Sequence, residues 1–263
     1  MGYMNNNIGY REEVLCTRSV IKKNRYAVLE PDGLVKNVIP GFENCDITIL
    51  GSPEMGASFV DYLVTAKEGG KNTAGFGGGM LEIFFYVLEG SVTAWNEDRN
   101  VPLTEGGYLY SPAGKKLYFE NSGKEDAKIF LYKRLYKPLE GKEAYTVAGN
   151  INEVPWVEYE GMKDVLVKDF LPSAKDLAFD MNMHILKFEM GTSHGYIETH
   201  VQEHGAYIYS GKGMYLLDGD WIPVKKGDYI FMDAYCPQAG YGVGRNEDFA
   251  YIYSKDCNRD IEL

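Results

Sequence analysis

An internal repeat constrains the fold of this chain more than any other feature of its sequence. When the sequence is shifted against itself by 121 residues, glycine, proline, tyrosine and alanine positions coincide without a gap. The coincident pairs are Gly90 and Gly211, Pro102 and Pro223, Gly106 and Gly227, Tyr108 and Tyr229, and Ala113 and Ala234. The same shift also pairs Glu68 with Glu189, Gly70 with Gly191, Tyr86 with Tyr207, and Tyr132 with Tyr253. Self-similarity of this extent predicts two copies of one domain.

Short apolar and aromatic runs between glycine turns indicate that each copy is built from strands. The chain contains 21 Tyr, 12 Phe and 30 Gly, and runs such as 83–88 and 206–209 are bounded by turn residues. Such runs are typical of strands, and long helical periodicity is hard to find. The predicted fold class is therefore all-β, with barrels or sandwiches of the jelly-roll kind.

A polar segment between the two copies suggests where the domains divide. Residues 138–153 show no strong strand pattern and are interrupted by Gly141 and Gly149. We place the boundary near residue 145, which gives an N-terminal domain of residues 1–145 and a C-terminal domain of residues 146–263.

The charge balance and the lack of long apolar stretches argue against some classes of partner. The chain has 27 Lys and Arg against 38 Asp and Glu, a net charge of −11, and no run rich in Lys or Arg. Such a chain repels phosphate backbones, so nucleic acid is not an expected partner. Its start lacks the regions of a signal peptide, and no segment approaches about 18 apolar residues. We expect a cytoplasmic protein with no membrane partner.

All four histidines lie between positions 184 and 204, inside the second copy. Glu198 and His200 are two residues apart and His204 follows four later, so on a strand all three side chains leave the same face. With a further donor from a neighbouring strand, for which Gln238 is the candidate, they can bind a divalent metal. A single histidine on a strand is more often structural, but three donors on one face favour a metal site.

The other two histidines leave the interpretation open. His184 shares a strand face with Asn182, and the two could line a pocket as polar contacts or lie on a wet outer face. The pocket is favoured more for Asn182 than for His184. His194, beside a glycine, is expected in a loop. The run 157–163 carries two carboxylates but no third donor, and is interpreted as solvated surface.

The spacing of these donors resembles the cupin superfamily, whose first motif runs roughly G-x5-HxH-x3,4-E-x6-G and whose second runs G-x5-P-x-G-x2-H-x3-N. In the first motif, Glu198 occupies the position of the first histidine and His204 occupies the position of the glutamate. Gly211 occupies the position of the final glycine. The second motif begins at Gly227 and places Gln238 at its histidine. It departs from the pattern at Asp233, Tyr235 and Gly242, which replace its Pro, second Gly and Asn.

A Glu, His, His, Gln set resembles the bicupin (S)-ureidoglycine aminohydrolases, the manganese enzymes of allantoin degradation. The resemblance extends over nearly the whole chain and includes YREE, GLVKNVIPGFENC, GASFVDYLVT, FDMNMHI, YIETHVQEHGAY, WIPVKKGDYIFM and YIYSKDCNRD. It implies a bicupin of two tandem jelly-roll barrels that hydrolyses (S)-ureidoglycine to (S)-ureidoglycolate and ammonia. It also implies one Mn²⁺ per chain, held in the C-terminal cupin.

The repeat offers an independent check on the ligand assignment. A shift of 121 residues places the four proposed ligands on Gly77, Gly79, Ile83 and Leu117. None of these residues has a side chain that can bind a metal. The N-terminal cupin is therefore expected to be a scaffold or an interface, and not a second active site.

The family pattern also implicates a tyrosine on the strand after the first motif and a tyrosine and lysine on the last strand, which here are Tyr215, Tyr251 and Lys255. The resemblance implies that these three are catalytic and substrate-binding. A buried lysine needs a partner, which a substrate carboxylate would supply. Asn182 is added as a further substrate contact. Tyr251, Tyr253 and Lys255 alternate along the last strand, so they can point into one barrel. Without the resemblance, core tyrosines and an exposed lysine would be favoured.

Two other classes of function stay open on the sequence alone. One is a metal-dependent cupin oxygenase or isomerase of another small polar acid, because a fold does not fix its chemistry. The other is a non-catalytic ligand-binding or storage bicupin, which four converging donors argue against. The expected partner is a small molecule. The extended ends, including residues 1–25, offer surface for strand exchange, so we also expect a homo-oligomer.

Overall fold

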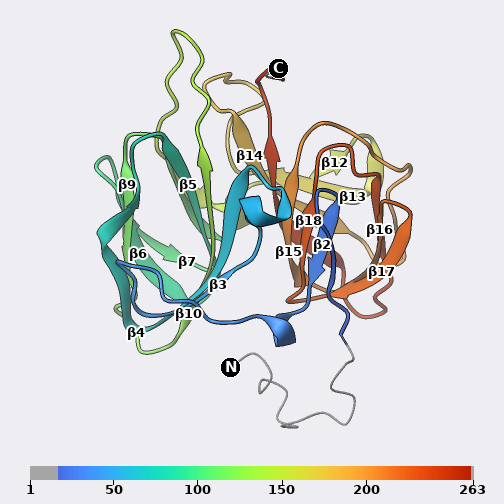
Figure 1. The fold of residues 1–263 in the computed structure, drawn as a ribbon, viewed down its shortest axis with the longest axis horizontal. Coiled ribbons are helices and arrows are strands. Elements are labelled where there is room, and N and C mark those ends of the chain that lie inside the picture. The colour runs from blue at the N-terminus through green and yellow to red at the C-terminus, as the bar shows by residue number, and fades with distance from the viewer. Residues whose placement is uncertain (1–16, 262–263) are drawn as a thin grey trace.

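The structure, a computed structural model, describes residues 17–261, whose regular secondary structure is almost entirely strand (Figure 1). The remaining residues, 1–16 and 262–263, lie outside the described part. They include the YREE segment and most of the N-terminal extension. The described helices are single 3-10 turns at Pro31–Gly33, Pro53–Met55 and Ile151–Glu153. No helix in residues 17–261 is long and apolar enough to cross a membrane. The all-β prediction is confirmed.

Most strands of the N-terminal copy form one antiparallel sheet that curls into the first barrel. The long β4 (Phe59–Gly77) pairs with β10 along its first half and with β9 near its end, so it turns a corner of the barrel. In spatial order the sheet contains β11 (Val147–Asn150), β8 (Gly107–Ser111), β5 (Leu81–Glu89), β10 (Ala127–Leu135), β4, β9 (Lys116–Glu120), β6 (Ser91–Trp95) and β7 (Asn100–Thr104), with β3 (Glu43–Ile49) beside β4.

The C-terminal copy repeats this plan with two sheets. The larger sheet contains, in spatial order, β1 (Val20–Lys22), β2 (Tyr26–Leu29), β18 (Tyr229–Met232), β15 (His204–Ser210), β20 (Phe249–Asp256), β14 (Met181–Phe188), β13 (Met162–Asp169) and β12 (Val157–Tyr159). The smaller sheet contains β17 (Asp220–Lys225), β16 (Lys212–Leu217) and β19 (Gln238–Gly242).

Cross-strand pairing confirms the repeat through the middle of each copy. Tyr86 on β5 lies opposite Tyr108 on β8, and their equivalents Tyr207 and Tyr229 lie opposite each other on β15 and β18. Turn glycines that precede or follow these strands, such as Gly90 and Gly211, both adopt positive φ. A conformation that favours glycine explains why the turns coincide in the sequence.

The shift of 121 residues does not hold on the last strand. Phe130 lies opposite Tyr86, whereas Ile252 lies opposite Tyr207, so β20 matches β10 at a spacing one residue longer. The irregularities in these two pairings lie at equivalent residues, Leu88 on β5 and Tyr209 on β15, so they do not account for the change. Tyr132 and Tyr253, which the sequence paired, therefore face different compartments: Tyr132 lies between the barrels and Tyr253 lies inside the second.

Each sheet is completed by a strand from the other copy. β2, at the start of the chain, pairs with β18 of the second sheet, and β11, which follows the first copy, pairs with β8 of the first sheet. Figure 1 shows the blue β2 among the orange and red strands of the C-terminal half. The division into residues 1–145 and 146–263 stays a prediction, since both sheets draw strands from either side of it.

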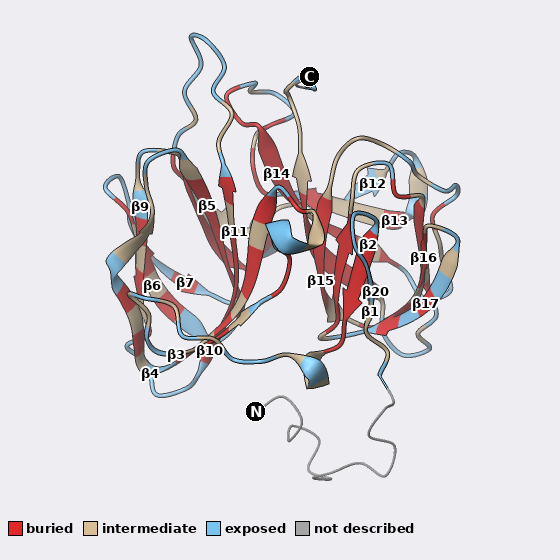
Figure 2. Ribbon diagram, viewed as in Figure 1, coloured by how far each residue is buried: buried red, intermediate tan, exposed pale blue. Residues whose placement is uncertain are grey.

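The buried side chains form three clusters: one inside each barrel and one between them. On β5, Phe85 faces the first barrel and Tyr86 faces the space between barrels; on β15, Ile208 and Tyr207 alternate in the same way. Figure 2 shows the central strands coloured as buried along much of their length. Alternating residues therefore serve two cores, as in stacked sheets.

The first barrel is filled with apolar side chains where the second carries polar ones. Ile83 and Leu117, the equivalents of His204 and Gln238, are fully buried in its core. By pairing, the equivalent of Glu198 is Phe76, not Gly77, because Phe76 lies opposite Leu117 as Glu198 lies opposite Gln238. The correction leaves the conclusion unchanged, because neither residue is a metal donor.

A buried carboxyl group joins the two barrels. Asp61 on β4 is fully buried, and the hydroxyl of Tyr229 on β18 donates a hydrogen bond of 2.6 Å to its Oδ2. Burial raises the pKa of Asp61 to about 8, although the bond from Tyr229 opposes the shift. At neutral pH the group is therefore a protonated acid in the folded protein.

Replacing Asp61 with Asn should remove a pH-dependent loss of stability. In the unfolded chain the carboxyl ionises near about pH 4, whereas in the folded protein it keeps its proton to about pH 8. The folded state binds more protons between these values, so this group lowers the free energy of unfolding as pH rises through them. We compare the free energy of unfolding of Asp61→Asn with that of wild type at each pH. Between pH 4 and pH 9 this difference should shift in favour of the variant by several kcal/mol, the order of magnitude that corresponds to the pKa shift of Asp61. Urea unfolding at both pH values measures this, and parallel pH profiles would contradict it.

Candidate metal centre

The four predicted ligands come from three neighbouring segments of the second barrel. His204 is the first residue of β15 and Gln238 is the first residue of β19. Glu198 pairs with Gln238 through two backbone hydrogen bonds of 2.9 and 3.0 Å. The sequence predicted a strand through residues 198–204, but β15 begins only at His204, because the backbone of Glu198 pairs with β19 instead.

The structure brings the side chains of these four residues together. The Nε2 atoms of His200 and His204 lie 3.3 Å apart, and the amide nitrogen of Gln238 lies 3.1 Å from Nε2 of His200. Oε2 of Glu198 lies 3.7 Å from the same His200 atom. Residues up to 40 positions apart in the chain, Glu198 and Gln238, therefore meet at one site.

Backbone carbonyl groups fix which nitrogen of each imidazole carries the proton. Nδ1 of His204 lies 2.7 Å from the carbonyl oxygen of Ser254, and Nδ1 of His200 lies 3.2 Å from that of Gln202. A carbonyl oxygen only accepts, so both Nδ1 atoms are protonated and both Nε2 atoms present lone pairs. Carbonyl contacts of this kind commonly orient metal-binding histidines.

Gln238 adds an unsatisfied oxygen beside a small void. Its Oε1 is buried and accepts no hydrogen bond within residues 17–261. The void has a volume of about 10 Å³ and is lined by Glu198, His204 and Gln238, together with Tyr215 and Tyr251. That is room for about one water-sized sphere or one ion.

These donors fit a divalent cation, although they are adjacent and not closed around it. In residues 17–261 no three His, Cys, Asp or Glu side chains are gathered tightly enough to hold an ion as they stand. The amide of Gln238 would supply the fourth donor. Two imidazole lone pairs facing each other repel, and an orphaned amide oxygen is costly, so a cation among them would relieve both.

The charge states of the donors are those that a metal requires. Burial, with His200 nearby, lowers the pKa of His204 to about 3, so its imidazole stays neutral. Burial alone would raise the pKa of Glu198, but its contacts with His200 and Tyr159 outweigh burial and lower the pKa to about 2. A neutral imidazole and an ionised carboxylate are ready to bind a cation.

Two residues that the sequence did not assign to the site lie next to the other oxygen of Glu198. The hydroxyl of Tyr159 donates a hydrogen bond of 2.7 Å to its Oε1, and Nε2 of His194 lies 3.8 Å from the same atom. Nδ1 of His194 accepts a hydrogen bond from the backbone of Gly240, so its proton is on Nε2, facing Glu198. Both side chains line the void.

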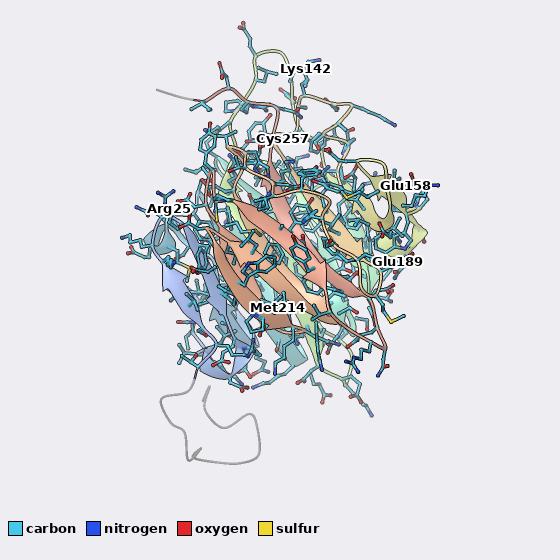
Figure 3. All side chains as sticks on the ribbon, turned by 90° about the vertical axis from the view of Figure 1, so that its right-hand side faces the viewer. Arg25, Lys142, Glu158, Glu189, Met214 and Cys257 are labelled. Atoms are coloured by element: carbon cyan, nitrogen blue, oxygen red, sulfur yellow. The ribbon has the colours of Figure 1, made fainter. Side chains whose placement is uncertain are left out.

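The position of Tyr159 shows why the sequence missed it. The run 157–163 was interpreted as solvated surface, and Glu158 does lie exposed at the edge of the molecule (Figure 3). Its neighbour Tyr159 is partly buried and turns toward Glu198. No sequence signal singled out Tyr159. His194 is in a loop, as expected, and only its membership of the histidine cluster indicated a buried role.

The predicted substrate-binding residues divide into two groups. The hydroxyls of Tyr215 and Tyr251 lie 2.9 Å apart and both rings line the void. Lys255, on the same face of β20, is half-buried and forms no hydrogen bond or ion pair within the described part of the chain. It lies close enough to His204 to lower the pKa of that imidazole.

Asn182 and His184 lie away from the void. Both polar atoms of the Asn182 side chain bond the backbone of Leu171, at 2.9 and 3.1 Å. His184 contacts Asp169 at 2.6 Å and stacks on Tyr253. Neither lines the void. The role of Asn182 as a substrate contact stays a prediction, and its existing bonds disfavour it.

Comparison with known proteins agrees with this fold. Residues 80–132 match the model of the cupin domain. The (S)-ureidoglycine aminohydrolase of Escherichia coli (strain K12) is 62% identical over 263 residues, all of both chains, and that of Arabidopsis thaliana is 30% identical over 93% of this chain and 79% of its own. The crystal structure of the E. coli protein YlbA superposes with a TM-score of 0.86 at 58% identity, covering 97% of this chain and all of its own.

More distant structures share the fold alone. Oxalate decarboxylase of Bacillus subtilis, described with Mn(II) centres, is 13% identical and gives a TM-score of 0.66 over 92% of this chain and 79% of its own. Fold and site together therefore define a bicupin with one donor-bearing barrel. Within that class, the full-length identity decides the family: the chain belongs to the (S)-ureidoglycine aminohydrolases, which are hydrolases acting on a C–N bond.

Nitrogen NMR of the metal-free protein should report the proton positions described above. We expect His200 and His204 to carry the proton on Nδ1 and His194 to carry it on Nε2, because the first two face carbonyl oxygens and the third faces a backbone N–H. Single histidine-to-glutamine variants assign the signals. A proton on Nε2 of His204 would contradict the arrangement.

Proposed function

We propose that this (S)-ureidoglycine aminohydrolase depends on one manganese ion held in its second barrel. The proposed ligands are Glu198, His200, His204 and Gln238, and the proposed catalytic and substrate-binding residues are Tyr215, Tyr251 and Lys255. The observation that carries the proposal is the pair of Nε2 lone pairs that face each other across 3.3 Å. As a family member the chain hydrolyses (S)-ureidoglycine: water replaces the amine on the α-carbon, giving (S)-ureidoglycolate and ammonia.

The donor chemistry supports manganese. A mixture of imidazole nitrogen and carboxylate or amide oxygen suits such borderline-hard ions, and the related fold of oxalate decarboxylase is described with Mn(II) centres. When bound, the ion would act as a Lewis acid on the substrate or on water. The hydrogen bond from Tyr159 would keep Oε1 of Glu198 occupied, with His194 close by, so that Oε2 is the oxygen that faces His200.

The paired tyrosines would act as hydrogen-bond donors. Burial raises the pKa of Tyr215 and of Tyr251 far above the usual value for a phenol. Both groups therefore keep their protons at neutral pH. Because one hydroxyl donates to the other, one proton of the pair is left to orient a polar atom of the substrate beside the void.

Lys255 would bind the substrate carboxylate. Its ammonium group has no protein partner in the described part of the chain and lies near His204. The void has room for an ion or a water and not for the substrate. The substrate would therefore lie outside the void, next to the donors. There Lys255 can form an ion pair with the substrate carboxylate and hold it against the barrel wall.

Some wider aspects of the function are proposals too. We propose a place in allantoin degradation, and so in purine catabolism and nitrogen metabolism, because the family reaction releases ammonia from a ureido compound. A cytoplasmic location and a homo-oligomeric state also stay proposals. The exchanged strands of the described structure pair within one chain, so oligomers would need other surfaces.

Removing a ligand should abolish both metal content and activity. We expect His200→Ala and Glu198→Ala to lose stoichiometric manganese and at least about a hundredfold of ammonia release, because each removes a proposed donor. Elemental analysis and an ammonia assay on freshly generated (S)-ureidoglycine measure both. His184→Gln is the matched control, since His184 contacts Asp169 and should keep metal and activity. Wild-type turnover in a metal-free variant would exclude the proposed mechanism.

Neutralising Lys255 should weaken substrate binding without removing the metal. For Lys255→Met we expect unchanged manganese content and a KM raised by roughly tenfold or more, because the substrate carboxylate loses its partner. Lys187→Met is the control, since Lys187 pairs with Asp248 away from the void. Steady-state kinetics test this, and an unchanged KM in Lys255→Met would rule out the proposed contact.

A further inference from the structure

A second and larger cavity lies between the two barrels, apart from the metal centre. It has a volume of about 300 Å³ and is bordered by β5, β15 and the segment 151–156. None of the residues that line it lines the void at the metal centre. Cavities of this size at domain interfaces are common places for small ligands to bind.

The cavity lies where equivalent parts of the two copies face each other. Tyr86 and Tyr207, which the repeat relates, both border it. Glu105 and Lys226, related in the same way, also border it but differ in charge. Lys226 lies 4.0 Å from Glu89, and all three charged side chains are exposed. Because the charges at the rim have opposite signs, the rim favours neither anions nor cations. The residues of the inner wall therefore determine which ligand binds.

The inner wall carries a buried lysine without a carboxylate partner. Lys168 on β13 is only 7% exposed. Its Nζ donates to the carbonyl oxygen of Ile151 at 2.8 Å and lies 4.6 Å from the ring centre of Trp156, but it forms no ion pair within residues 17–261. A buried ammonium group without a counter-charge is costly. An anion in the cavity would compensate it.

Aromatic groups form much of the remaining wall. The hydroxyls of Tyr86 and Tyr209 form no hydrogen bond in the described part of the chain, and both border the cavity. The ring of Trp156 also borders the cavity, and the Lys168 ammonium group lies over it. Flat walls suit a planar molecule, and free hydroxyls suit one that carries polar atoms on its ring.

We propose that this cavity binds a small planar monocarboxylate. Its carboxylate pairs with Lys168, its ring lies against Trp156, and its polar ring atoms bond the hydroxyls of Tyr86 and Tyr209. An inorganic anion would leave the aromatic walls uncovered, and an uncharged ring would leave the lysine unpaired. The site is independent of the metal centre and of the hydrolytic reaction.

Calorimetric titration of the full-length protein with orotate, a planar monocarboxylate, tests the proposal. Uracil is the matched ligand control because it has the same ring without the carboxylate. We expect one orotate per chain in wild type, and an affinity reduced by roughly thirtyfold or more in Lys168→Met. Lys187→Met is the matched protein control: the Nζ of Lys187 also lies over the Trp156 ring, 5.0 Å from its centre, but Lys187 does not line the cavity. It should bind orotate as wild type does.

Two further variants keep the test decisive. Glu198→Ala removes a proposed metal ligand and should leave orotate binding intact, so loss of binding there would place orotate at the metal centre and overturn the proposal. Tyr209→Phe removes one hydroxyl and should weaken orotate severalfold even if Lys168→Met fails to fold. Equal binding of uracil and orotate, equal affinity in Lys168→Met and Lys187→Met, or no orotate binding at millimolar concentration would each refute it.

Discussion

The exchange of one strand between the two copies is the constraint on which the rest of the structure depends. β2 completes the second sheet against β18, and β11 completes the first against β8. Tyr26 on β2 lies opposite Met232, and Met232 in turn lies opposite His204. The register of a strand from the start of the chain therefore helps to fix a proposed metal ligand in the second barrel.

Close contact between the barrels follows from this exchange. Asp61 of the first barrel bonds Tyr229 of the second, and it packs so tightly on Gly205 that a Cβ there would lie 1.9 Å from its Oδ2. Gly205 directly follows His204. The first barrel carries no donors at the equivalent positions, but it shapes the backbone that holds the ligands of the second.

The sequence predicted the features that depend on local spacing. The repeat, the all-β class and the clustering of Glu198, His200, His204 and Gln238 follow from turn glycines, alternation and a family pattern, and the structure brings those four side chains together. The sequence did not predict the exchanged strands or the one-residue slip on β20, because strand pairing between distant segments leaves no local pattern. Tyr159 was missed for the same reason: its contact with Glu198 depends on how β12 packs across the barrel.

Divergence between the copies explains why two distinct polar sites can exist in one duplicated fold. Inside the barrels, Ile83 and Leu117 occupy the positions that His204 and Gln238 occupy in the second copy. Between the barrels, Leu88 is the equivalent of Tyr209, and pairing makes Thr48 the equivalent of Lys168, because each lies opposite the matching residue of the next strand. Each change places a polar group on a wall that its counterpart leaves apolar or uncharged. Because buried polar groups are costly without partners, both sets of changes are best explained by something that binds against them.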